Sequence, residues 1–215
     1  SGKLRSLGTD RDLRPLYDQM EPLKYDVVIC PHCGYAALTR FFGGLTAGQI
    51  KAIKENISAN FHPVKEEKET YTYEEALYRY KLCLANTIVK HGKVSEKAYI
   101  CLKAGWLLRS MGENLDPAVE DYNKKMQEIK EQEKDFLKNA LDGLITARQT
   151  ESYPICGMDE VTLEYLIAVL AMEFEKYDIS SRLIYNILNT PTVNNRIKDK
   201  AREVKDELLQ QMGKK

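Results

Sequence analysis

The sequence has no long apolar run and no excess of charge of either sign. Its most apolar run, LIAVLAM at residues 166–172, is far shorter than the roughly 20 residues that a membrane-spanning helix needs. Lys plus Arg and Asp plus Glu number 32 each, so the formal net charge is zero. A dedicated nucleic-acid-binding protein normally has a basic excess. We therefore expect neither a membrane protein nor a nucleic-acid-binding one.

The N-terminal segment lacks the apolar stretch of a secretory signal. The first residue is Ser1 rather than Met, so we expect the natural chain to extend further upstream. The cysteines number five, which is odd, and only Cys30 and Cys33 are close in sequence. Such a set is not a disulfide framework, and a cytoplasmic location fits it best.

The motifs of common enzyme classes are also absent. No GxSxG, HExxH, GxxxxGK[ST] or GxGxxG pattern occurs. Cys83, Cys101 and Trp106 lie within apolar helical stripes, where core packing is the default for such residues. The sequence favours a non-catalytic protein, and only the remaining cysteine pair leaves an enzymatic function open.

Most of the chain shows apolar residues at helical spacing. Helix starts are indicated by capping boxes at Thr46–Gln49 and Thr72–Glu75, by Asp116-Pro117, by residues 157–160 and by Asn195. The long helix after Asp116 has an apolar stripe that Glu133 interrupts, which predicts a place where this helix projects beyond the core. Residues 174–191 resemble the second half of a tetratricopeptide repeat. We therefore expect a mostly α fold, a tetratricopeptide-like antiparallel helical array.

We expect two domains. Residues 1–66 form an N-terminal segment with a strand at 24–29 (KYDVVI), the CxxC motif, a helical turn within 35–44 and a short helix. A polar, linker-like stretch follows at 61–69. Residues 67–215 form the tetratricopeptide-like helical domain.

The CxxC motif, CPHCG at residues 30–34, is compatible with redox chemistry. Cys30 would then be the nucleophile and Cys33 the resolving thiol, provided that Cys30 lies at a helix N-terminus, where its pKa is lowered. The order strand, CPHC, helix also occurs at the start of thioredoxin-like proteins. That fold needs further strands after the helix, and none is predicted between residues 45 and 215.

The same motif is compatible with metal binding, because its proline and glycine allow a turn in which two thiolates reach one ion. Zinc needs four ligands, so the motif is half of a site. The best third candidate is Cys156, since YPICG at 153–157 repeats the pattern of CPHCG with tyrosine in place of the first cysteine. This is either a half-lost second knuckle or a coincidence. Candidate fourth ligands are His32, His62, His91 and residues upstream of the chain.

Three segments together resemble the bacterial Domain of Unknown Function 2225 family. They are KYDVVICPHCGYAA at 24–37, LDGLITARQTESYPICGMDEVTLEYLIA at 141–168 and RIKDKAREVKDELL at 196–209. Members of that family typically carry another CxxC near the N-terminus, and the two pairs look like a four-cysteine zinc site ahead of tetratricopeptide-like helices. The first pair is absent here, so the resemblance implies zinc ligands only at Cys30 and Cys33 and a site that is incomplete within this chain. The family has no assigned activity.

These features together predict a non-catalytic scaffold that binds a protein or peptide partner in a groove between helices. Zinc held by Cys30, Cys33 and Cys156 would act as a structural clip, because metal binding to a small module contributes to its folding. The alternative is a thiol-disulfide oxidoreductase that uses the CPHC motif. A zinc-ribbon nucleic-acid-binding protein is a third hypothesis, disfavoured by the zero net charge.

Overall fold

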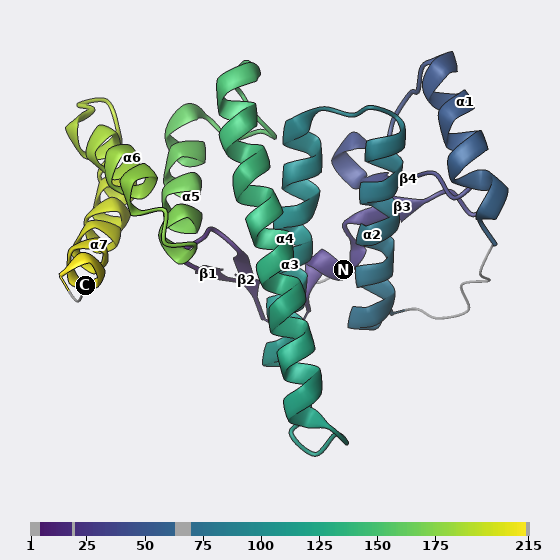
Figure 1. Cartoon of the computed structure of the whole chain (residues 1–215), viewed down its shortest axis with the longest axis horizontal. Helices are drawn as coiled ribbons and strands as arrows, with labels where there is room; N and C mark the ends of the chain where they lie inside the picture. Colours follow the sequence, from purple (N-terminus) through teal and green to yellow (C-terminus); the bar gives the residue numbers. More distant parts are fainter. Residues whose placement is uncertain (1–4, 19, 63–69, 214–215) are drawn as a thin grey trace. The chain divides into compact units, whose positions relative to one another are not determined.

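The computed structural model describes residues 5–18, 20–62 and 70–213 and is mostly α-helical (Figure 1). The α-helices are α1 (Ala47–Asn56), α2 (Tyr73–Val89), α3 (Val94–Glu113), α4 (Tyr122–Thr150), α5 (Glu160–Glu173), α6 (Tyr177–Asn189) and α7 (Asn195–Met212). The strands β1 (Ser6–Thr9) and β2 (Pro15–Tyr17) form one antiparallel hairpin, and β3 (Val27–Ile29) and β4 (Ala36–Leu38) form another. Short 3-10 helices are η1 (Pro22–Tyr25), η2 (Thr39–Phe41) and η3 (Ser58–Asn60). The mostly α fold class is confirmed, whereas tetratricopeptide-like packing stays a prediction.

The chain forms two compact units. The central unit is Gln19–Ala140, and the C-terminal unit combines Ser1–Asp18 with Leu141–Lys215, so the division falls within α4. The domain boundary expected at residues 66 and 67 lies outside the described residues, and that division stays a prediction. Within the described part of the chain, no helix combines the length and apolar composition needed to cross a membrane.

In the central unit, α2 packs against α3, and the β3–β4 hairpin and η1 lie against α2. The phenol of Tyr80 is buried and donates a hydrogen bond to the Leu23 carbonyl at 3.1 Å. Cys83, Cys101 and Trp106 are buried, as expected. Burial raises the pKa of the Cys83 thiol to about 12 and that of Cys101 to about 11, so both thiols are protonated at neutral pH.

Local capping explains where two of these helices begin. Thr46 and Thr72 each accept a hydrogen bond from the backbone N–H three residues later, and the side chains of Gln49 and Glu75 accept one in return from the N-cap amide. Both capping boxes predicted from the sequence are therefore confirmed.

The start of α4 differs from the prediction. The Asp116 carboxylate accepts a hydrogen bond from the Ala118 N–H at 2.9 Å, which makes a local turn rather than a helix cap. Asp121 then has a positive φ of 58°, a conformation that a right-handed helix cannot contain. The helix consequently begins only at Tyr122.

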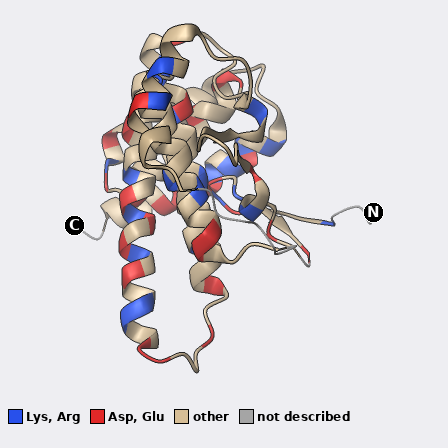
Figure 2. Cartoon of the chain, turned by 90° about the vertical axis from the view of Figure 1, so that its right-hand side faces the viewer, with Lys and Arg blue, Asp and Glu red and all other residues tan. Residues whose placement is uncertain are grey.

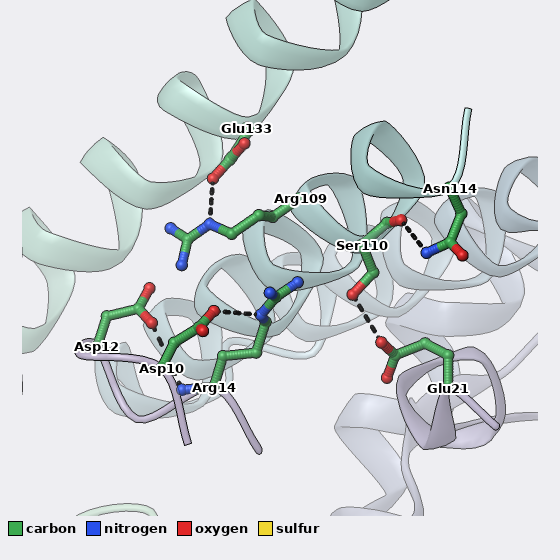
Figure 3. A network of polar contacts seen from close by, with 8 residues as sticks. All are labelled: Asp10, Asp12, Arg14, Glu21, Arg109, Ser110, Asn114 and Glu133. Carbon is green, nitrogen blue, oxygen red and sulfur yellow. Dashed lines mark hydrogen bonds and ion pairs between the residues drawn. The ribbon is translucent and has the colours of Figure 1, made fainter. Parts of the chain in front are cut away.

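Basic and acidic positions alternate along α4, as Figure 2 shows. Glu133 is one of these acidic residues, but it is not directed at solvent. Its carboxylate accepts a hydrogen bond from Arg109 Nε of α3 at 2.7 Å (Figure 3). Their side chains are only 17% and 22% exposed, respectively. The expectation that α4 projects beyond the core at Glu133 is therefore wrong, since the charge is accommodated by an ion pair.

In the C-terminal unit, α6 and α7 both pack against α5. All residues from Leu163 to Met172 are buried, including the carboxyl-bearing Glu164, which forms an ion pair with Arg148. Ser180 of α6 is fully buried and donates a hydrogen bond to the Ala168 carbonyl of α5 at 2.8 Å. The small side chain lets the two helices approach closely at that point.

We expect Arg109→Ala or Glu133→Ala to lower the free energy of unfolding by about 1–3 kcal/mol, because each removes the opposite charge from a largely buried group. Urea unfolding of both single variants and the double variant should give a coupling energy of about 0.5–3 kcal/mol. The exposed pair Lys51–Glu55 is the control, and alanine there should change stability by about 0.5 kcal/mol at most. Zero coupling between Arg109 and Glu133 would contradict this account.

Candidate functional site

The CPHC motif forms the turn of the β3–β4 hairpin in the central unit. Ile29 at the end of β3 is opposite Ala36 at the start of β4. The Cys30 N–H donates to the Tyr35 carbonyl at 2.7 Å, and the Gly34 N–H donates to the Cys30 carbonyl at 3.0 Å. These two hydrogen bonds close the loop, so that Cys30 and Cys33 belong to one tight turn.

The residues after the motif do not form the helical turn expected between positions 35 and 44. Ala36–Leu38 is strand β4, and only a short 3-10 helix, Thr39–Phe41, follows it. Cys30 therefore precedes a hairpin turn and not a helix. The helix dipole that lowers the pKa of the first cysteine in a thioredoxin-like site is consequently not available to Cys30.

The two cysteines of the turn pack against an apolar cluster. Its buried members are Tyr35, Ala37 and Ile53, and the partly buried residues packed against it are Cys30, Cys33, Leu45, Ile57 and Val89. The cluster joins the hairpin to α1 and to the end of α2. Both cysteines therefore have one side against apolar groups while staying partly exposed.

Two side chains outside the motif hold the carbonyl groups of the turn. Ser58 Oγ, from η3, donates to the Cys33 carbonyl at 2.7 Å. Asn86 Nδ2, from α2, donates to the Gly34 carbonyl at 3.0 Å. The sequence analysis identified neither residue, and the available signal was an asparagine within a largely apolar helix.

The pKa values of the two thiols shift in opposite directions. Backbone N–H groups of His32 and Cys33 point at the Cys30 sulfur and lower its pKa. Burial raises the pKa of Cys33, and the Tyr35 N–H acts against this rise. Because metals bind thiolates, backbone donors around sulfur suit a metal-binding turn. The same donors would suit a redox thiol, so this asymmetry does not separate the two chemistries.

Gly34 is required by both its conformation and its surroundings. Its φ is +71°, in the left-handed region. A Cβ atom at this position would lie 2.5 Å from Cγ of Phe61. A larger residue would therefore have to displace the ring that covers the turn.

Cys156 belongs to the C-terminal unit, in the turn before α5. Cys156 and Gly157 have φ values of 50° and 78° and are the central residues of a tight turn. Ile155 and Met158 flank them and exchange backbone hydrogen bonds of 3.0 and 2.9 Å. The segments YPICG and CPHCG thus share a glycine with positive φ but form turns of different hydrogen-bond pattern.

Among the described residues, no three His, Cys, Asp or Glu side chains form a group that could hold a metal ion. His32, His62 and His91 are exposed residues of the central unit. None of the five cysteines, all of which are described, forms a disulfide. The structure brings together Cys30 and Cys33, and a zinc ion bound by Cys30, Cys33 and Cys156 stays a prediction.

We expect Gly34→Ala to lower the free energy of unfolding by about 2–4 kcal/mol, from left-handed strain and the contact with Phe61. Gly48→Ala is the matched control, because Gly48 lies in α1 with no atom within 4 Å of the added Cβ. That change should stabilise the chain by up to about 1 kcal/mol. Thermal and urea unfolding would measure both, and equal effects would show that the turn tolerates a side chain.

Comparison with known protein families identifies a match over most of the chain. A family described as "Uncharacterized protein conserved in bacteria (DUF2225)" matches residues 1–208. No match was found among curated proteins or among solved structures. The match covers nearly the whole chain, including both units and the CPHC turn. The chain therefore belongs to the DUF2225 family of bacterial proteins.

Proposed function

We propose that the chain is a non-catalytic helical scaffold that binds a protein or peptide partner and uses the CPHC turn as a structural half-site for zinc. The observation that carries the metal part is the hairpin turn itself. It places Cys30 and Cys33 in one closed loop, with backbone N–H groups directed at the Cys30 sulfur. Two thiolates on a rigid turn are half of the tetrahedral set that zinc prefers. When bound, zinc would supply a covalent-like crosslink and no reaction step.

The partner-binding part is supported by the outer face of α2. Tyr78 and Ile88 are each 55% exposed, although both are large and mainly apolar. Tyr80, on the same helix, is buried against η1 and shows that the inner face is already occupied. Aromatic and aliphatic side chains exposed on one helix suit recognition of a protein surface.

Zinc content and thiol reactivity test the metal half-site. We expect the full chain to retain zinc, with Cys30 and Cys33 resisting alkylation until a chelator is added. Cys30→Ser and Cys33→Ser should each abolish retention. Cys101→Ser is the control, because that thiol belongs to α3 and is buried in the protein core. Cys156→Ser tests the third ligand predicted from the sequence. Absence of zinc, with Cys30 and Cys33 oxidising reversibly as a pair, would instead favour the thiol-disulfide oxidoreductase.

The α2 surface is tested by affinity capture with the full chain as bait. The double change Tyr78→Ala and Ile88→Ala should weaken retention of a bound partner by about tenfold or more, as expected for central interface residues. Lys51→Ala is the control, because it removes an exposed charge from α1 rather than α2 and should leave retention nearly unchanged. If both variants retain the same proteins as the wild type, α2 is not the docking surface.

A further inference from the structure

We infer that Asn86 of α2 is a positioning residue for the metal half-site, because it fixes the peptide group that directs a backbone donor at Cys33. The inference rests on the proposed zinc half-site. Asn86 would not bind the metal itself but would orient a group that contacts one of its ligands. It is carried by the hydrogen bonds of the Asn86 amide and by the geometry of the peptide between Gly34 and Tyr35.

The orientation of the Asn86 amide is determined by its surroundings. The residue is fully buried, and Nδ2 donates to the Gly34 carbonyl at 3.0 Å and to the Leu82 carbonyl at 2.9 Å. Both donor hydrogens are thus used. Rotating the amide by half a turn would place Oδ1 against two carbonyl oxygens, so the opposite orientation is excluded.

The oxygen atom of the Asn86 amide, in contrast to its nitrogen, makes no hydrogen bond that holds the turn. Oδ1 of Asn86 is buried and has no hydrogen-bond partner among the described residues. An unsatisfied buried acceptor is destabilising, and an apolar side chain at this position would avoid that cost. The two donors are therefore the property that distinguishes asparagine from leucine here, and one of them is directed at the CPHC turn.

The effect reaches the cysteine through one peptide group. In a trans peptide the carbonyl and the N–H point in opposite directions. The Gly34 carbonyl is held by Asn86, and the N–H on the other side of the same plane belongs to Tyr35. That N–H is the backbone group that donates toward the Cys33 sulfur. By fixing the carbonyl, Asn86 aims the N–H at the sulfur and restricts the rotation of the plane.

A neighbouring contact restrains the preceding peptide in the same way. Ser58 Oγ donates to the Cys33 carbonyl at 2.7 Å, and the N–H of that peptide is the Gly34 N–H, which closes the loop onto Cys30. The turn is thus held on two successive peptides by side chains from η3 and α2. Of these two side chains, only Asn86 acts on the peptide whose N–H faces a sulfur atom.

The test is a Co²⁺ titration of the full chain, monitored through the sulfur-to-cobalt charge-transfer absorption. Competition with Zn²⁺ then gives the affinity of the chain for zinc. Asn86→Leu keeps the number and branching of the side-chain heavy atoms but removes both donors. We expect it to weaken metal affinity about 10–100-fold, the usual effect of losing a residue that orients a ligand. Tyr80→Phe is the matched control, because it also removes a buried hydrogen bond from α2 to a backbone carbonyl, that of Leu23. Its metal affinity should equal that of the wild type.

A measurement on the wild-type chain covers the case in which Asn86→Leu does not fold. Cd²⁺ should shift the NMR resonances of the Tyr35 amide and the Asn86 side-chain amide, and leave that of Tyr80 in place. A folded Asn86→Leu variant with wild-type affinity would overturn the inference, as would equal weakening by Tyr80→Phe. Unmoved Tyr35 and Asn86 resonances in a metal-loaded wild type would overturn it too. A wild type that binds neither Co²⁺ nor Zn²⁺ would overturn the half-site itself, and the inference with it.

Discussion

The packing of α2 against the β3–β4 hairpin is the constraint on which the candidate site depends. A hairpin of two three-residue strands is marginal by itself, because it has little apolar area and many unpaired backbone groups. Two side chains of α2 donate to backbone carbonyls within it: Arg79 Nη2 to that of Val27 at 3.1 Å, and Asn86 Nδ2 to that of Gly34 at 3.0 Å. The helix thus takes the place of a neighbouring strand, and the geometry of the CPHC turn follows from that support.

Elements with local causes could be predicted from the sequence, and those with distant causes could not. Thr46 and Thr72 cap their helices through residues three positions away, so the pattern alone located both helix starts. Ala36–Leu38 is a strand because it pairs with Val27–Ile29, a partner that local propensity does not contain. Glu133 is likewise explained only by Arg109, which lies on the preceding helix.

The candidate site shows the same division. Cys30 and Cys33 were found from their spacing, because all the residues of a CxxC motif lie within four consecutive positions. Asn86 lies 52 residues from Gly34 in sequence, and Ser58 lies 25 residues from Cys33. Nothing in the spacing of the motif indicates which side chains hold its carbonyls. A polar residue among buried apolar ones, such as Asn86 on α2, is the single clue that the sequence offers.

The form of the support also bears on which chemistry suits the turn. A redox pair must change the distance between its sulfurs and alternate between thiol, thiolate and disulfide, which favours a site with one strongly activated sulfur at a helix end. In this chain the peptides on either side of Gly34 are each held by a side chain. A turn fixed in this way loses little conformational freedom when an ion binds, so more of the binding free energy is available to stabilise the fold. The two side-chain contacts, and not the thiol pKa values, are thus what favours the proposed structural metal over a redox couple at Cys30 and Cys33.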